Sequence, residues 1–270
     1  MNAAICLRRL LTSLAATLLV ACTASAPTTP VAPVGPSPEK VEAAIAEAFA
    51  ALARAEIDDP YELLFLDLAY RRFGRSEGAG AMADYVMTTT EPPQPDRWLM
   101  ARWGNAALPH DGAAIAGMER SNSNRGLLEA MYCKEQPIPA DYVIYARDAI
   151  AKGGYDLTHV LSGYAFAKEA GCSYPLSDDE VSEMINATAA LLPGTGMTDL
   201  QIEAALILAW SGRKDLLPPD TLSRLLSVRW KNGGWGQTTT SKFADGHATM
   251  LALNLMLELT ATPRGPVVAR

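Results

Sequence analysis

Two kinds of predicted helix alternate along this chain, and that alternation limits its fold more than any other feature. One kind is amphipathic, with its apolar side chains gathered on a single face. The other kind is apolar nearly all round, so each such helix must be buried on every side. The amphipathic helices are predicted over 38–56, 139–152, 178–192 and 219–231. The apolar helices alternate with them, over 60–73, 157–170, 198–212 and 245–260.

This order predicts an all-α fold built as two concentric layers. Short turns join half-buried helices to fully buried ones, so we expect an α/α toroid of about five to six helical hairpins, with the apolar helices as the inner barrel. The alternative is an α-solenoid of stacked helix pairs. Four further helices are predicted over 79–88, 97–103, 113–119 and 122–134, and no segment has a convincing strand pattern.

A repeated turn supports the layered arrangement. It consists of two glycines and an aromatic residue, Gly153-Gly154-Tyr155 and Gly233-Gly234-Trp235. Each turn is followed by an aspartate and a histidine at the start of an apolar helix, namely Asp156 with His159 and Asp245 with His247. The two turns are 80 residues apart. That spacing equals two hairpins of about 40 residues, and the helices over 178–192 and 198–212 supply the hairpin between them.

The second copy of this turn resembles a known repeat. Residues 232–237 read Asn-Gly-Gly-Trp-Gly-Gln, and residues 245–249 read Asp-Gly-His-Ala-Thr before an apolar helix. This arrangement is similar to the repeat of the squalene–hopene cyclase and protein prenyltransferase superfamily. The resemblance covers 225–260, in part 146–172, and elsewhere only the helix pattern. In that superfamily a Gly-Gly-Trp turn ends each outer helix of an α/α toroid, so the resemblance implies the same architecture here.

The catalytic motifs of that superfamily do not carry over to this chain. The class II cyclases use an Asp-x-Asp-Asp run, which this sequence lacks. Protein prenyltransferases hold zinc with Asp, Cys and His, and although His247 matches the histidine, the sequence has no Asp-x-Cys partner. The helices of His159 and His247 have another inner helix between them, which puts their axes about 15 Å or more apart. We therefore predict no metal site and no cofactor.

The N-terminus carries a signal of its own. Arg8 and Arg9 precede a largely apolar stretch of 11 residues over 10–20, which is too short to span a bilayer because a spanning helix needs about 20 residues. The run Leu-Val-Ala-Cys at 19–22 resembles the lipobox of bacterial lipoproteins, in which the chain is cut before the cysteine and the thiol of that cysteine, here Cys22, carries lipid. The alternative is an ordinary secretory signal cut near residue 21 or 24.

These features predict the domain organisation and the location. Residues 1–21 form the signal peptide, 22–37 the lipidated Cys22 with a tether rich in Pro, Thr and Ala, 38–262 a single toroid-like domain, and 263–270 a disordered tail. The lipid on Cys22 makes the membrane a partner. Thr23 stands where an aspartate retains lipoproteins at the inner membrane of enteric bacteria. The resemblance therefore implies a cell-envelope protein at the outer membrane, facing the periplasm.

The charge balance excludes one class of partner. The formal net charge is −7 for the whole chain, and it becomes −9 when cleavage removes Arg8 and Arg9. The sequence contains no cluster of Lys and Arg. Nucleic-acid binding needs such a basic surface, so we predict no nucleic-acid partner.

Two cysteines remain for a disulfide. Cys6 leaves with the signal peptide and Cys22 carries the lipid, so Cys133 and Cys172 are left in an oxidising compartment. Both lie at or just past the C-terminal ends of successive inner helices. We predict that they form a disulfide; the alternative is two separately buried thiols.

The inner helices of a toroid point the same way, so their N-termini gather at one mouth. The polar residues expected near this rim are Tyr61, Asn122, Asn124, Asp156, His159, Thr198, Asp199, Asp245 and His247. Helix dipoles disfavour positive charge there, so both histidines are expected to be neutral at pH 7. A neutral imidazole can act as a base. The candidate catalytic residues are therefore His159, His247, Asp156 and Asp245.

A structural role for these residues stays open beside the catalytic one. Asp156 and Asp245 stand where N-caps belong, and a cap needs no further role. The two histidines that follow them can bond back to the incoming loops. Tyr155 and Trp235 are expected to pack at the ends of their hairpins.

Two functions are compatible with the sequence, which leaves open whether the protein is an enzyme. The first is a binding or assembly module for an envelope protein or polymer, because no catalytic motif is intact. The second is a hydrolase or lyase acting on an envelope glycan or another polymer. Convergence of the candidate side chains in an open cleft of about 300 Å³ or more favours the enzyme, whereas caps that point into a packed barrel favour the binding module.

Overall fold

The computed structural model describes residues 35–54, 60–78, 112–118, 123–241 and 244–267. In this part of the chain the regular elements are helices and no strand occurs, which confirms the all-α prediction. The α-helices are α1 (Pro38–Arg54), α2 (Pro60–Phe73), α5 (Gly112–Gly117), α6 (Ser123–Met131), α7 (Tyr142–Lys152), α8 (Gly154–Ala170), α9 (Asp178–Ala189), α10 (Asp199–Trp210), α11 (Thr221–Ser227) and α12 (Gly246–Thr260). Two short 3₁₀ helices are η1 (Ser76–Gly78) and η2 (Lys214–Leu216).

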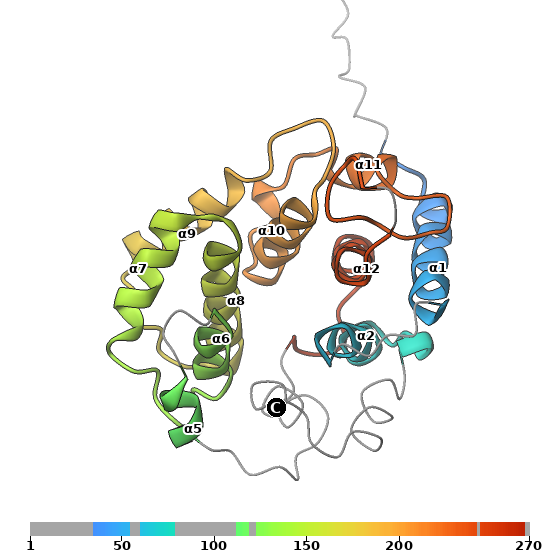
Figure 1. Cartoon of the computed structure of the whole chain (residues 1–270). Helices are drawn as coiled ribbons and strands as arrows, with labels where there is room; N and C mark the ends of the chain where they lie inside the picture. The colour runs from blue at the N-terminus through green and yellow to red at the C-terminus, as the bar shows by residue number, and fades with distance from the viewer. Residues whose placement is uncertain (1–34, 55–59, 79–111, 119–122, 242–243, 268–270) are drawn as a thin grey trace, which may run out of the picture. The chain divides into compact units, whose positions relative to one another are not determined.

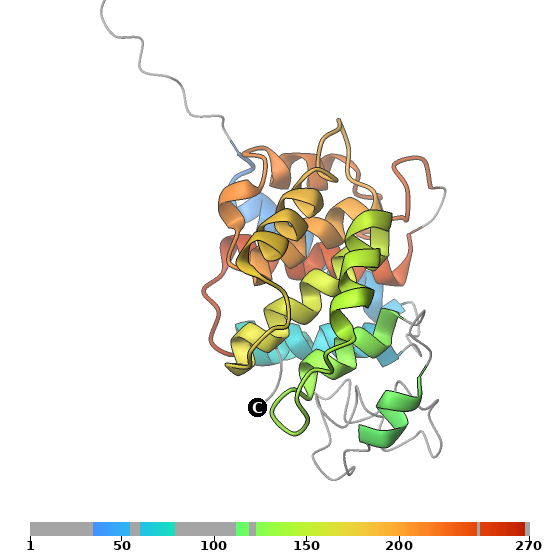
Figure 2. The same ribbon diagram turned by 90° about the vertical axis from the view of Figure 1, so that its left-hand side faces the viewer.

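Burial separates these helices into two layers. α10 buries nine of its twelve residues and α12 eleven of its fifteen, whereas the amphipathic α7 buries three of its eleven. The inner helices contact one another in the order α2, α12, α10, α8 and α6. α1 packs on α12, α7 on α8, and α9 on both α8 and α10. Figure 1 shows the inner helices as a curved row with the others outside it, and Figure 2 shows α7 and α9 covering one side of that row.

Closure of the curved row into a toroid, as opposed to an open solenoid, stays a prediction. The helices expected over 79–88 and 97–103 lie outside the described residues. So do residues 1–34, which hold the predicted signal peptide, Cys22 and most of the tether. The described residues from 35 onward belong to one compact unit. Within the described part of the chain, each helix is too short or too polar to cross a membrane.

Local capping fixes where α9 and α10 begin. Ser177 and Thr198 each accept a hydrogen bond from the backbone N–H three residues later, and Glu180 and Gln201 reach back to the caps, so both predicted capping boxes are present. α8 ends at Ala170, and the next residue, Gly171, adopts the left-handed conformation that favours glycine. Among the described residues, the predicted helices are found with ends that differ by at most three residues, except that the helix predicted over 219–231 is shorter, Thr221–Ser227.

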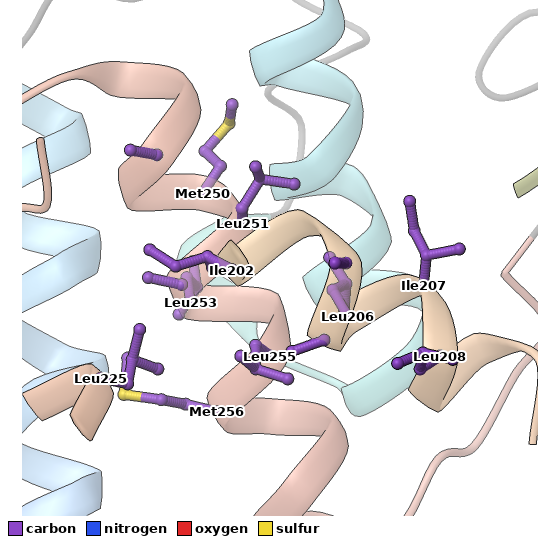
Figure 3. Close-up of a cluster of buried hydrophobic side chains, with 14 of the residues drawn as sticks. Ile202, Leu206, Ile207, Leu208, Leu225, Met250, Leu251, Leu253, Leu255 and Met256 are labelled. Carbon is purple, nitrogen blue, oxygen red and sulfur yellow. The ribbon is translucent and has the colours of Figure 1, made fainter. Parts of the chain in front are cut away.

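The apolar core fixes the positions of α10 and α12. Ile202 and Leu206 of α10 belong to the same buried cluster as Leu251 and Leu255 of α12 and Leu225 of α11 (Figure 3). None of these five side chains is more than 1% exposed. Full burial of a side chain of this size contributes about 1.5–3 kcal/mol. This packing fixes the positions of α10 and α12, and with them the positions of the N-terminal residues of both helices.

The second Gly-Gly-aromatic turn needs glycine for both conformation and space. Gly233 has a φ of +90°, and a Cβ there would lie 2.6 Å from the carbonyl oxygen of Glu47 in α1. A Cβ on Gly234 would also collide with a neighbouring side chain. Trp235 is fully buried, and its indole N–H donates to the Leu225 carbonyl at 2.9 Å. The buried Trp235 and its hydrogen bond to Leu225 therefore hold α11 against the inner layer.

The first turn differs in one respect from what we expected. Gly153 and Gly154 have φ values of +71° and +60°, and the space around both is open. α8 begins directly at Gly154. Tyr155 is 46% exposed, so the expectation that it packs at the hairpin end was wrong. Its hydroxyl reaches across to α10 instead, where a buried carboxylate accepts its hydrogen bond.

Two features fasten the C-terminal ends of the inner helices. Cys133 and Cys172 form a disulfide with Cα atoms 6.2 Å apart, which joins the chain just past α6 to the chain just past α8 and confirms the predicted pairing. The tail predicted to be disordered from residue 263 is held as far as Val267. The Val267 N–H donates to both carboxylate oxygens of Glu169, at 2.8 and 2.9 Å, and its side chain is buried.

Candidate functional site

The N-terminal ends of α8, α10 and α12 meet at one place, which we call the mouth. Asp199, the first residue of α10, links the other two helices. The Tyr155 hydroxyl of α8 donates to Asp199 Oδ2 at 2.7 Å. His247 of α12 places Nδ1 3.1 Å from Asp199 Oδ1. The sequence expectation that these N-termini gather is met for these three helices.

Burial and exposure differ sharply within this group. The Asp199 residue is 3% exposed, whereas the His247 side chain is 42% exposed and Tyr155 46%. The backbone N–H of Asp199 also donates to the Gln237 carbonyl at 3.0 Å, which ties the loop before α12 to the same point. Asp199 is thus a buried carboxylate that orients two side chains reaching the surface.

His247 carries a positive charge at pH 7, contrary to the expectation of a neutral imidazole. Burial lowers its pKa, but the hydrogen bond and charge of Asp199, with the charges of Glu203 and Asp245, outweigh burial and raise the pKa to about 9. The expectation considered only the dipole of α12. The attraction between the imidazolium and a carboxylate in direct contact is stronger than the effect of a helix terminus, which contributes at most about 2 kcal/mol.

The Tyr155 phenol stays protonated over the whole physiological range. Burial and the hydrogen bond to Asp199 both raise its pKa well above 10, and the nearby carboxylates act in the same direction. Tyr155 can therefore offer a ligand its ring face and the lone pairs of its hydroxyl, but not a phenolate base.

Glu203 lies one helical turn deeper in α10 than Asp199. It is 4% exposed, and the Thr158 hydroxyl donates to its Oε1. Burial raises the pKa of Glu203 to about 7, although the Thr158 hydrogen bond and the charge of His247 oppose this rise. Sequence reasoning did not single out Glu203 as a site residue. The signal was its position as the one charged residue in the apolar run from Gln201 to Trp210.

His159 faces the same carboxyl group from α8. Its Nε2 lies 3.8 Å from Glu203 Oε1, beyond hydrogen-bond distance. Burial lowers its pKa to about 4, and the charge of His247 acts in the same direction. His159 is therefore neutral at pH 7, as expected. Its Nδ1 is buried and has no hydrogen-bond partner among the described residues.

The two candidate aspartates have different roles. Asp245 is the N-cap of α12, because its Oδ1 accepts from the Ala248 N–H at 3.1 Å, and Gln237 donates to its Oδ2 at 3.3 Å. Asp156 is not a cap, because α8 already begins at Gly154. It pairs instead with Lys152, one turn back, at 3.3 Å.

The other residues expected at the rim contribute less. Thr198 caps α10 and has no direct bond to the histidines or to Asp199 among the described contacts. Asn124 lies at the start of α6. Asn122 and the side chain of Tyr61 lie outside what the structure describes.

Asp199, Asp245 and His247 form one group of donors that could hold a metal ion. One ligand atom of each lies within 4.8 Å of the others. Both oxygens of each aspartate already accept hydrogen bonds from the protein, and His247 Nδ1 is bonded to Asp199. These atoms serve the protein's own hydrogen bonds, and we assign no metal to them.

Two sizeable cavities lie away from the mouth. One of about 330 Å³ runs along α7 between Asp141 and Asp156, and another of about 820 Å³ lies between α1 and the end of α12 near Thr260. Neither is lined by His159 or His247. Of the four candidate side chains, His247 and Asp245 lie together beside Asp199. His159 lies beside Glu203, and Asp156 lines the cavity along α7. These two cavities are therefore not a cleft that receives the histidines.

No protein-family model, curated protein or solved structure matches this chain significantly. The resemblance to the cyclase and prenyltransferase repeat thus rests on the turn motif and the helix pattern alone. What the site can do follows from its own chemistry. It presents a proton donor on His247, a buried carboxylate that orients it, and a half-exposed aromatic ring.

Proposed function

We propose that the protein is a lipid-anchored cell-envelope enzyme, a hydrolase or lyase that acts on a glycan or another envelope polymer at the mouth. The single observation that carries this proposal is the hydrogen-bonded array Tyr155–Asp199–His247, built from three different helices. Strongly shifted pKa values gathered at one point are typical of acid–base sites.

His247 supplies the proton-transfer group in this proposal. Its Nδ1 is oriented by Asp199, which leaves Nε2 for a ligand. With a pKa raised to about 9, His247 is an imidazolium at pH 7 and acts first as a general acid, donating its Nε2 proton to a leaving oxygen. Asp199 stays buried and acts by orienting the ring and stabilising its charge, as the aspartate of a catalytic triad does.

Tyr155 is proposed to bind the substrate rather than to move a proton. Its half-exposed ring offers a flat apolar surface beside His247, and its hydroxyl is fixed by Asp199. A polymer unit lying on this ring would place a polar group near the imidazolium.

The location rests on the predicted lipobox at Cys22. The disulfide between Cys133 and Cys172 supports an oxidising compartment outside the cytoplasm. The acidic net charge of −7 gives no basis for a nucleic-acid partner.

A binding or assembly module is the second candidate, and one observation favours it. The carboxylate oxygens of Asp199 and Asp245 are all satisfied within the protein, and both sizeable cavities described above lie elsewhere. In this second candidate the array has a purely structural role, which is to hold α8, α10 and α12 together by hydrogen bonds.

One experiment separates the two candidates. Isolated cell envelopes are incubated with the full lipidated chain, and soluble fragments are measured for wild type, His247→Ala, His159→Ala and the control Asp179→Asn, which removes an exposed charge on α9. The enzyme predicts that His247→Ala lowers fragment release about 10²–10⁴-fold while Asp179→Asn has no effect. No release by wild type, or equal release by folded, lipidated His247→Ala, would contradict the enzyme.

A further inference from the structure

A polar surface extends from His247 to the loop before α12. Gln237 in this loop donates through its side-chain Nε2 to Asp245 Oδ2 at 3.3 Å. Asp245 lies beside His247, because one ligand atom each of Asp199, Asp245 and His247 lies within 4.8 Å of the others. The Gln237 carbonyl accepts from the backbone N–H of Asp199 at 3.0 Å. The Gln237 side chain therefore borders the Tyr155–Asp199–His247 array but takes no part in its hydrogen bonds.

The side chains along this surface are open to a ligand. Gln237 is exposed and Asp245 is partly exposed. The His247 side chain and Tyr155 are both close to half exposed. Asp199, which joins them, is buried. A ligand at the mouth would therefore meet an amide, a carboxylate, an imidazole ring and the ring of a tyrosine.

Gln237 and Asp245 have hydrogen-bonding capacity to offer a ligand. A glutamine amide carries two N–H donors and a carbonyl acceptor, and among the described contacts the Gln237 side chain uses one donor. Asp245 Oδ2 accepts from Gln237 alone among these contacts, and a carboxylate oxygen has lone pairs for more than one donor. A hydroxyl group both donates and accepts, so two neighbouring hydroxyls can bond to this pair together.

The charges around the pair disfavour an ionic ligand. The imidazolium of His247 reaches the surface and repels a cationic group. The carboxylates of Asp199 and Asp245 lie beside it and repel an anionic group. The half-exposed ring of Tyr155 favours an apolar face on the ligand. A sugar ring of an uncharged glycan has both features, since it carries neighbouring hydroxyls and an apolar C–H face.

We propose that the mouth recognises an uncharged glycan and that Gln237 is its specificity-determining residue, binding sugar hydroxyls together with Asp245 while the apolar face of the sugar lies on the Tyr155 ring. This inference rests on the proposed function of the mouth and names its substrate class. Tyr155 and Gln237 both bond to Asp199, so a short oligosaccharide can reach both. Recognition of this kind involves no proton transfer and can be measured apart from turnover.

Binding of oligosaccharides to the full lipidated chain in detergent tests the inference. Two probes are neutral hexamers, one of β-linked glucose and one of β-linked N-acetylglucosamine. Two more have the same linkage and carry charge, namely the glucuronate hexamer and the glucosamine hexamer. Calorimetry at pH 7, in the cold to slow any turnover, should show binding of at least one neutral hexamer. Both charged hexamers should bind about tenfold more weakly or worse, because each meets a like charge at the mouth.

Variants of Gln237 test its role directly. Gln237→Ala should weaken binding of the neutral hexamer about 3–10-fold, because hydrogen bonds to the sugar are lost. The exposed position and the retained backbone carbonyl, which accepts from Asp199, keep this variant folded. Asp179→Asn on α9 should change nothing. Gln237→Glu adds a negative charge beside Asp245 and should shift the preference toward the glucosamine hexamer.

The shift in preference separates recognition from a structural role for Gln237, which would change the binding of all four hexamers equally. Failure of wild type to bind either neutral hexamer, or charged hexamers bound as tightly as the neutral one, overturns the inference. Unchanged binding by both Gln237 variants also overturns it. Neutral-hexamer binding without fragment release from envelopes refutes the enzyme and leaves the inference standing. Fragment release without such binding leaves the enzyme and overturns the inference.

Discussion

The charge on His247 should appear in the stability of the folded protein. The perturbation is His247→Gln, which keeps a polar side chain and removes the titration. The pKa of about 9 in the folded state lies about 2.5 units above the usual 6.5, which corresponds to about 3.4 kcal/mol. The His247 side chain is 42% exposed, so solvent screening reduces this contribution, and we expect about 1–2 kcal/mol.

The raised pKa of His247 determines how its contribution to stability changes with pH. A histidine that binds its proton more tightly when folded adds its full stability below pH 6.5, and that stability is lost as pH rises through about 9. His247→Gln should therefore be less stable than wild type by about 1–2 kcal/mol at pH 6, and the difference should shrink by pH 10.

Urea unfolding at pH 6, 8 and 10 provides the free energies, with the disulfide intact throughout. Comparison of wild type with the variant cancels the titration of all other groups to first order. A difference between the two proteins that is the same at pH 6 and pH 10 would refute the reasoning, because the ion pair with Asp199 would then contribute nothing.

Three further predictions concern the buried acid, the turn and the disulfide. Because the pKa of Glu203 is raised, ionisation of its carboxyl group destabilises the folded protein as pH rises from 4.5 through about 7. The free energy of unfolding of Glu203→Gln, measured in urea, should therefore increase relative to wild type by about 2–3 kcal/mol between pH 4.5 and pH 8. The same difference between the two proteins at both pH values would contradict this. Gly233→Ala should cost about 2–4 kcal/mol, because φ is +90° and the Glu47 carbonyl lies 2.6 Å from the added Cβ; a thermal midpoint equal to wild type would speak against the turn geometry. Reducing the bond between Cys133 and Cys172, which are separated by 39 positions, should remove about 4 kcal/mol, and equal thiol titration with and without reductant under denaturing conditions would show that no disulfide exists.

The sequence pattern was sufficient to predict the helices because the burial of their apolar side chains in the core determines where the helices form. α10 and α12 are apolar all round and are found as inner helices. Their start sites follow from caps that can be read directly, Thr198 for α10 and Asp245 for α12. The pairing of Cys133 with Cys172 followed from their places at the ends of successive inner helices.

The site could be predicted only in part, because its key contacts join distant positions. His247 is 48 positions from Asp199 and Tyr155 is 44. Sequence could place each at a helix start but not show that Asp199 bridges the other two. The charge of His247 was therefore mispredicted from the helix dipole alone. Asp156 was misassigned as a cap because α8 begins two residues before it, at Gly154.

The tail shows a different limit. Residues 263–267 have no periodic pattern, so sequence gave no reason to expect order there. Their order comes from the Glu169 carboxylate and Arg72, which bind the backbone at Val267 and Gly265. Both partners lie far away in the chain.

Titration of the His247 imidazole in the full chain, compared with that in Asp199→Asn, tests the account most directly. An acid–base mouth built on the Tyr155–Asp199–His247 array predicts a His247 pKa of about 9 in wild type and a fall of more than one unit in the variant, because removing an opposite charge in direct contact shifts a pKa by about 1–3 units. A wild-type His247 that titrates at or below the usual 6.5, unchanged in Asp199→Asn, would contradict the account.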